Sequence, residues 1–309
     1  MFRLTVKLCV LFLSFAILAA PIAFAKGNIP LSARECKILL KPGNFADRTQ
    51  GLKAFWEVVK QTAQEENVGF KDLEGAFKLE SARIIRFYDT PKLELYKLSL
   101  ILRQRQDADI KKSGRVEEDG KKFELVLKYR HPDPLVAVVQ DCHPGSGYHG
   151  EISFEEDVVA KADTIDHLFS LSGKIGDVKK VGDQLKDWYE FYPGLKNLKL
   201  DKDLPIKQVN GITITEFVVE PGKLDFGKGV KAKVSMSVWY RNGQNKPLIA
   251  EFSYKYRLEP GDSLNSNIYR SARESDRFLK ALQTKAKEWI AVGQTKTGLI
   301  YNTTASHQE

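Results

Sequence analysis

Alternating apolar and polar residues are the dominant pattern in this chain, and they predict strands along most of its length. In residues 123–130, FELVLKYR, apolar side chains take the odd positions and three of the even positions are charged. Successive side chains of a strand point to opposite faces, so this segment predicts a half-buried strand of an antiparallel sheet. Similar patterns predict strands at 32–41, 79–88, 95–106, 135–142, 150–156, 204–210, 211–220, 230–240 and 247–257.

Helical spacing of apolar residues marks other segments. Residues 48–66 carry a stripe of Leu, Phe, Trp and Val after a capping residue, Asn44 or Asp47. Residues 266–291 carry a second stripe of this kind. Residues 157–195 also indicate helices, with interruptions, that cover one face or end of the sheet.

The order of these elements indicates the fold class. The turn sequence RNGQNKP at 241–247 joins the last two predicted strands into a hairpin. Hairpins with segregated helices are typical of an antiparallel α+β fold rather than of βαβ units. The chain has 309 residues, 42% of them hydrophobic, and no Pro/Gly/Ser-rich linker divides it. We therefore predict one domain over residues 26–295 and a polar C-terminal tail over 296–309.

Residues 1–25 have the features of a secretory signal peptide. Arg3 and Lys7 precede an apolar run at 8–20 that is too short to span a membrane, and the small-x-small signal Ala23-Phe24-Ala25 follows. We expect an exported protein, periplasmic or secreted, with no membrane span after cleavage. Cleavage removes two cations and no acidic residue, which lowers the formal charge from +8 to +6. This modest excess permits an anionic partner without requiring one.

Two cysteines remain after cleavage, Cys36 and Cys142. In an oxidising compartment they are candidates for a disulfide. A bond requires Cα atoms within about 7 Å, which sequence spacing alone does not establish. The disulfide therefore stays open beside the alternative of two free thiols.

The polar faces of the predicted strands carry both signs of charge. In an open, half-solvated sheet these residues would be ordinary outer-face residues. In a closed barrel they would line the interior, where an isolated ion costs several kcal/mol or more. A mixed lining suits a polyphosphate with a divalent metal, because Arg and Lys meet phosphate oxygens and carboxylates hold the metal. The residues in question are Arg103, Arg105, Lys128, Lys231, Lys233, Lys255 and Arg257, with Glu124, Glu151, Glu155 and Glu251.

A more specific motif lies at 83–105, RIIRFYDTPKLELYKLSLILRQR, where two strands flank a turn marked by proline. Arg103 and Arg105 share one face of the second strand, an arrangement that suits bidentate recognition of phosphate or carboxylate. The string resembles the strand, Tyr-Asp-Thr turn and Leu-Arg-x-Arg strand of the CYTH superfamily, the triphosphate tunnel metalloenzymes. The likeness spans roughly 33–290 and is specific over 83–130. The matching residues are Tyr88, Asp89, Thr90, Leu93, Leu95, Leu98, Leu100, Leu102, Arg103 and Arg105.

The resemblance implies both a fold and a function. The fold is an antiparallel β-barrel or tunnel of about eight strands with flanking helices. The function is hydrolysis or transfer at a triphosphate, with Mg²⁺ or Mn²⁺ held by glutamates. Together with the polar faces, the resemblance gives Arg103, Arg105, Lys128, Lys255, Arg257 and Lys41 as phosphate-binding residues. The metal ligands on the same grounds are Glu151, Glu155 and Glu251.

The chain departs from the family pattern at two places. Ser99 stands where the family usually has Gly, and ECKILLK at 35–41 replaces the opening Glu-x-Glu-x-Lys strand. If Lys41 is the motif lysine, Lys37 and Leu39 take the glutamate positions. If Glu35 is the first glutamate, they replace the second glutamate and the lysine. Either register removes carboxylates from the expected metal site, which weakens the case for catalysis more than the case for anion binding.

These features favour an exported protein that binds a phosphorylated polyanion, a triphosphate or polyphosphate, in a basic tunnel. Whether it is an enzyme stays open; an active form would be a divalent-metal-dependent triphosphate phosphohydrolase. The alternative is a non-catalytic exported scaffold or protein-interaction module with a degenerate tunnel, closed by ion pairs such as Glu251 with Arg105. No nucleic-acid partner is expected, because the aromatic residues of 247–257 point away from its cations.

Overall fold

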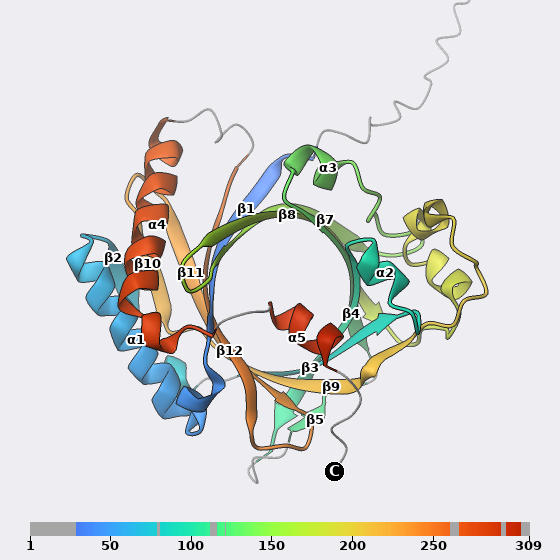
Figure 1. The fold of residues 1–309 in the computed structure, drawn as a ribbon, viewed down its shortest axis with the longest axis horizontal. Coiled ribbons are helices and arrows are strands. Elements are labelled where there is room, and N and C mark those ends of the chain that lie inside the picture. Colours follow the sequence, from blue (N-terminus) through green and yellow to red (C-terminus); the bar gives the residue numbers. More distant parts are fainter. Residues whose placement is uncertain are drawn as a thin grey trace, which may run out of the picture.

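The computed structural model describes residues 29–78, 81–111, 116–120, 122–259, 266–291 and 295–303, so the predicted signal peptide at 1–25 lies outside the described residues. Nine strands form a closed barrel, seen end-on in Figure 1. They are β1 (Leu31–Leu40), β3 (Ser81–Asp89), β4 (Leu100–Ile110), β6 (Phe123–His131), β7 (Gly150–Ala160), β8 (Ile165–Val178), β9 (Lys207–Val219), β11 (Lys231–Arg241) and β12 (Pro247–Arg257).

The barrel follows the order β12-β1-β7-β8-β6-β4-β3-β9-β11 and is closed by pairing of β11 with β12. The predicted α+β barrel with flanking helices is therefore confirmed. It has nine strands rather than about eight, and β1 and β7 run parallel, so the barrel is mixed rather than fully antiparallel. The short strands β2 (Gly69–Asp72), β5 (Val116–Glu118) and β10 (Gly222–Asp225) extend it at the edges.

The described helices are short apart from two. They are α1 (Arg48–Glu65), α2 (Glu94–Lys97), α3 (Pro134–Val138), α4 (Ser266–Lys285) and α5 (Lys296–Asn302), with 3-10 turns η1 (Pro42–Phe45), η2 (Ala76–Lys78), η3 (Leu185–Tyr189), η4 (Pro193–Leu198) and η6 (Lys287–Trp289). Within the described part of the chain, every helix is too short or too polar to cross a membrane.

Two apolar cores lie outside the barrel wall. On one flank α1 and α4 cover the outer faces of β1, β11 and β12, where the Phe55 and Phe252 rings are 5.6 Å apart. On the opposite flank η3 and η4 bring Trp188 and Tyr192 against the outer face of β6 and β8. The apolar faces of these strands thus face outward under the helices, which leaves their polar faces to line the barrel interior.

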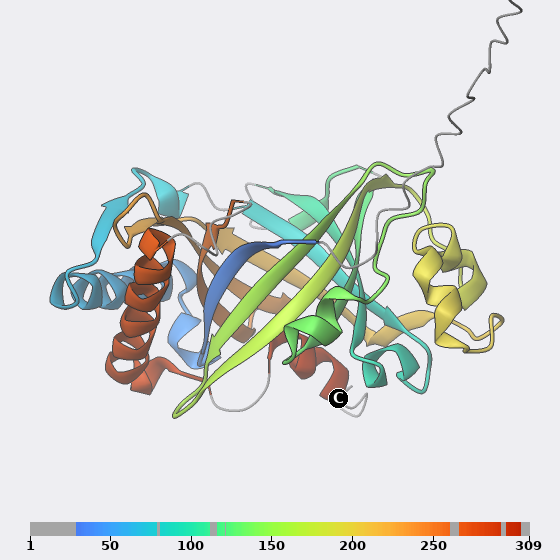
Figure 2. The ribbon, with the colours of Figure 1, turned by 90° about the horizontal axis from the view of Figure 1, so that it is seen from above.

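A third apolar cluster lies inside the barrel at one end. Ile300 and Tyr301 of α5 pack there against inward-facing residues such as Phe87 and Trp239. Figure 1 shows α5 within the ring of strands, and Figure 2 shows it toward one end of the barrel. The predicted polar tail at 296–309 is therefore wrong for 296–302, because α5 belongs to the domain; residues 304–309 lie outside the described part.

Two other predicted elements are also wrong. The predicted strand at 135–142 contains the helix α3, because Asp133 caps it by accepting a hydrogen bond from the Leu135 amide and Pro134 takes the first helical position. The predicted helices at 157–178 are strand instead: β7 runs to Ala160 and pairs with β8 along its full length. Pairing on both sides of β8 overrides the helical spacing there.

The Tyr-Asp-Thr turn has a structural role. The buried Asp89 carboxylate accepts hydrogen bonds from the amides of Thr90, Leu95 and Tyr96, at 2.7–3.0 Å, and so fixes α2 against the end of β3. The predicted strand at 95–106 begins only at Leu100 for this reason. Ser99 has φ +61°, a left-handed conformation that glycine adopts without the steric cost of a side chain.

Candidate functional site

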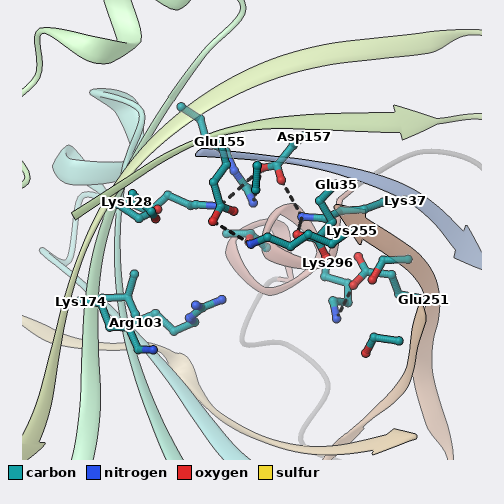
Figure 3. Close-up of a pocket in the computed structure, with 18 of the residues that line it drawn as sticks. Glu35, Lys37, Arg103, Lys128, Glu155, Asp157, Lys174, Glu251, Lys255 and Lys296 are labelled. Carbon is teal, nitrogen blue, oxygen red and sulfur yellow. Dashed lines mark hydrogen bonds and ion pairs between the residues drawn. The ribbon is translucent and has the colours of Figure 1, made fainter. Parts of the chain in front are cut away.

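The charged half of the barrel interior forms a cavity of about 800 Å³. Ten cationic and eight acidic side chains line it, drawn from strands that are distant in sequence and from α5. Figure 3 shows many of them pointing toward one another across the cavity. The cations are Lys37, Arg83, Arg103, Arg105, Lys128, Arg130, Lys174, Lys255, Arg257 and Lys296. The acids are Glu35, Glu124, Glu151, Glu155, Asp157, Glu216, Glu251 and Glu259.

Asp157 is the central carboxylate of this cavity. Its side chain is 2% exposed and lies 2.7 Å from Lys37 Nζ, 3.4 Å from Lys128 Nζ and 3.5 Å from the Arg130 guanidinium. Burial alone would raise the pKa of Asp157, but Lys128, Lys37 and Arg130 hold it well below its usual range. One buried anion therefore holds three cations from two strands.

The three cations are not equivalent. Burial lowers the pKa of Lys128 to about 8. The attraction of Asp157 raises this pKa, but repulsion from Arg130 and Lys37 offsets part of that increase. Lys37 also loses solvation, but Asp157 and Glu35 raise its pKa above the ordinary value. Lys37 and Glu35 form a second ion pair at 3.0 Å. Lys128 is thus the cation of this group that titrates nearest neutral pH.

Arg103 is a cation of the cavity whose charge is compensated only from a distance, by Glu124 and Glu216. Among the described residues it has no ion pair, and its Nε is buried without a hydrogen-bond partner. Burial and repulsion from Arg105 lower the pKa of Arg103 to about 9. Arg105 itself approaches Glu124 only to 3.9 Å, while Lys174 lies 3.2 Å from the same carboxylate. An anion beside Arg103 would therefore find a guanidinium group whose Nε–H has no hydrogen-bond acceptor in the protein.

The architecture and the charges together decide the type of fold. Basic and acidic side chains from distant strands converge inside a closed barrel, as the resemblance over residues 83–130 implies. The structure is therefore the closed, charge-lined barrel that the resemblance predicts.

No protein-family model and no curated protein matches this sequence. Solved structures similar to this chain include HpAC1 from Hippeastrum, described as an adenylyl cyclase candidate with a dominant triphosphatase activity. The two sequences are 11% identical, and the match covers 89% of this chain and 97% of HpAC1 with a TM-score of 0.42. A candidate adenylate cyclase from Bacillus halodurans is 12% identical, covering 85% and 94%, with a TM-score of 0.35. PH1819 from Pyrococcus horikoshii is 13% identical, covering 81% and 89%, with a TM-score of 0.31. These likenesses are too low to transfer the role of any residue.

Five of the six predicted phosphate-binding residues line the cavity of the barrel: Arg103, Arg105, Lys128, Lys255 and Arg257. Of these, Lys255 is held by Glu155 at 2.7 Å. Lys41 is the exception, because β1 ends at Leu40 and Lys41 is exposed, its amide bonded to the Trp289 carbonyl outside the cavity. The first strand instead points Glu35, Lys37 and Leu39 into the cavity.

The three predicted metal ligands do not fit a metal site as they are arranged. Glu151 has an 82% exposed side chain, Glu155 is paired with Lys255, and Glu251 is paired with Lys296 at 2.8 Å. Glu155 lies opposite position 33 of β1 and Glu251 opposite position 39, which separates them by about 20 Å along the strand. Nowhere in the described ranges do three His, Cys, Asp or Glu side chains gather around a common point suited to a metal. No step through Mg²⁺ or Mn²⁺ follows from this geometry.

The end of the cavity next to α5 contains a carboxylate pair that accepts one cation. Lys296 enters from α5 and contacts both Glu216 and Glu251, with Nζ to oxygen distances of 3.3 and 2.8 Å. Burial would raise the pKa of Glu216, but Lys296 and Arg105 lower it to about 2. The Glu251–Arg105 pair that the scaffold alternative predicts is absent among these contacts, since Lys296 takes Glu251 and Arg105 faces Glu124.

Cys36 and Cys142 are both free, so of the two alternatives the structure has the free thiols rather than the disulfide. Cys36 lies in the core beneath α4, with Sγ 3.7 Å from Ser275 Oγ, whereas Cys142 lies in the core beside η3 and η4 on the opposite flank of the barrel. Burial raises the pKa of the two thiols to about 11 and about 12, which disfavours the reactive thiolate.

Proposed function

We propose that the charged half of the barrel binds a small phosphorylated polyanion, such as a triphosphate or a short polyphosphate. The observation that carries this proposal is Arg103, a half-buried side chain that lines the cavity and has a buried, unpartnered Nε. The two-cation excess in the lining and a volume within the range of small-molecule sites support it. Export of the protein, predicted from residues 1–25, belongs to the same proposal.

The proposal concerns binding and includes no hydrolytic step. The carboxylates that would hold a divalent metal are separated and paired with lysines. We therefore expect the polyanion to be held by guanidinium and ammonium groups directly. Removal of divalent metal with EDTA should then leave its affinity unchanged.

Arg103→Ala is expected to weaken the binding of tripolyphosphate by roughly 10- to 100-fold, because a hydrogen bond to a charged group contributes about 1.5–3 kcal/mol. Isothermal calorimetry in EDTA buffer measures this difference. Arg270→Ala is the matched control, since Arg270 is exposed on α4 outside the barrel. Equal affinity of wild type and Arg103→Ala would refute the role of the cavity. No binding by the wild type would instead favour the scaffold alternative.

The affinity for tripolyphosphate is also expected to fall as the pH rises from 7 to 8.5, a range that stays below the pKa of about 9 of Arg103. Lys128 has a pKa of about 8, and only its protonated form attracts an anion, so the loss of its proton weakens binding by roughly three- to tenfold. Lys128→Arg keeps the charge over this range and should flatten the pH profile. The ligand titrates identically in both experiments, so parallel profiles for the two proteins would exclude Lys128 as the cause.

A further inference from the structure

The ammonium group of Lys296 lies at the α5 end of the cavity, surrounded by polar and aromatic side chains. Its Nζ lies 2.8 Å from Glu251 Oε1, 3.0 Å from Ser237 Oγ and 3.3 Å from Glu216 Oε1. The indole ring of Trp239 covers a further side, with its centroid 4.6 Å from Nζ. The Lys296 side chain is 15% exposed, so this environment is largely shielded from water.

This set of groups matches the chemistry of a primary ammonium. An ammonium on a single carbon has three N–H donors, and the site offers three oxygen acceptors and an aromatic face, which attracts cations. Trp239 Nε1 also donates to Glu216 Oε1 at 2.8 Å, which fixes the indole and the carboxylate relative to one another. The acceptors and the ring stand on the neighbouring strands β9, β11 and β12, so the barrel wall holds the site independently of α5.

The same groups suit a hard divalent metal poorly. Mg²⁺ requires near-octahedral oxygen ligands and Ca²⁺ six to eight of them, whereas one side of this site is the carbon face of an indole. The remaining oxygen of Glu216 points toward Arg83, at 3.7 Å. A singly charged ammonium, which an aromatic ring attracts, matches these groups better.

We propose that Glu216, Ser237, Trp239 and Glu251 form a binding site for a primary ammonium group, which Lys296 fills from within the chain. A free primary alkylammonium occupies this site when Lys296 is removed or displaced. The inference does not rest on the polyanion proposal, because its groups bind a cation; Glu216 is the one member of the site that also interacts electrostatically with Arg103 and Arg105.

The test uses Lys296→Ala in the full chain, because alanine keeps Cβ and leaves a space where the propylammonium part of the side chain lay. Thermal unfolding is followed in increasing propylammonium chloride and, separately, in equal concentrations of tetramethylammonium chloride. We expect propylammonium at ten times its dissociation constant to raise the Tm of the variant by about 3–5 °C relative to tetramethylammonium, which has no N–H donor. The wild type should show no such difference.

Two further variants make the result specific. Lys296→Met fills the space with an uncharged side chain and should not respond to propylammonium. Lys296→Ala combined with Glu251→Gln removes one carboxylate and should lose most of the response. An equal Tm shift in these controls would overturn the proposal, as would a greater stabilisation of Lys296→Ala by Mg²⁺ than by propylammonium.

Lys296→Ala also remains informative if it does not fold in plain buffer. It is then refolded from urea in propylammonium or in tetramethylammonium chloride. Recovery of folded protein in propylammonium alone supports the site. Equal recovery in both salts, or recovery in neither, overturns it.

Discussion

Asp157→Asn is expected to lower the free energy of unfolding by about 3–5 kcal/mol, because it leaves buried cations without their anion. Asparagine has the size of aspartate, so the change removes charge rather than packing. Lys37, Lys128 and Arg130 all lie within 3.5 Å of this carboxylate, whose side chain is 2% exposed. Urea denaturation at pH 7 measures the loss. Asp203→Asn is the control, since Asp203 also pairs with a lysine but is half exposed, and it should leave stability nearly unchanged.

The sign of the pH dependence follows from the depressed pKa of Asp157. A carboxyl group with a lower pKa in the folded state stabilises the fold fully above its unfolded value of about 3.9 and loses that contribution as the pH falls through the folded value. The difference between wild type and Asp157→Asn should therefore stay constant from pH 5 to 7 and shrink only in strong acid. A loss no greater than that of Asp203→Asn would contradict the central role of Asp157.

The same variant separates stability from binding. Removal of the Asp157 charge increases the net positive charge of the cavity, so tripolyphosphate should bind Asp157→Asn more tightly than the wild type. Arg103→Ala should have the opposite effect on affinity. Because Arg103 has no ion pair among the described residues, its removal should also cost little stability.

The lining of the barrel follows from the sequence wherever the alternation of polar and apolar residues identifies the strand. The pattern at 150–156 places Glu151 and Glu155 on one face, and both line the cavity. Asp157 continues the same alternation by one step, but it lies where the helical spacing of apolar residues predicts a helix. Because of this helix prediction, the sequence does not place Asp157 on the polar face of the strand. The strand continues to Ala160 because β7 pairs with β1 and β8, which are distant in sequence.

Lys296 and the apolar cluster around α5 could not be predicted in this way. The partners of Lys296 lie 45–80 residues away in sequence, and no local pattern relates a short C-terminal segment to the inside of a barrel. The one local signal is Leu299, Ile300 and Tyr301, three consecutive apolar residues in a segment read as polar tail. Their burial is decided by barrel closure, which is a tertiary event.

The motif that indicated the family proved to carry two different kinds of information. Asp89 and Thr90 form the turn that fixes α2, so they stabilise the fold but take no part in the cavity. Arg103 and Arg105 belong to the same string and do line the cavity. The sequence alone did not separate these roles, because both involve polar residues flanking strands.

The interior of the barrel has two physically distinct ends. Toward Arg257 and Glu151 the lining is charged and partly exposed, whereas around α5 it is apolar and buried. Water and ions can therefore approach the charged residues from one side, while α5 fills the other. A polyanion is expected to enter and leave by the charged end.

Phe87→Ala is the variant that tests whether the α5 end is a packed core. Phe87 is 1% exposed, points into the barrel, and has ring centroids of Tyr301 and Trp239 at 6.0 and 6.1 Å. Truncation of a buried phenylalanine removes its transfer free energy and leaves a cavity, so the free energy of unfolding should fall by about 3–5 kcal/mol. Urea denaturation of full-length protein gives the value.

Leu135→Ala is the matched control for this truncation. Leu135 is 75% exposed on α3, and its removal should change the stability by less than about 0.5 kcal/mol. If Phe87→Ala behaved like Leu135→Ala, the α5 end would be an aqueous opening that already surrounds Phe87 with water. A loss of the expected size, together with unchanged tripolyphosphate affinity, would establish that the barrel is closed at this end and that its ligand is held only by the charged half.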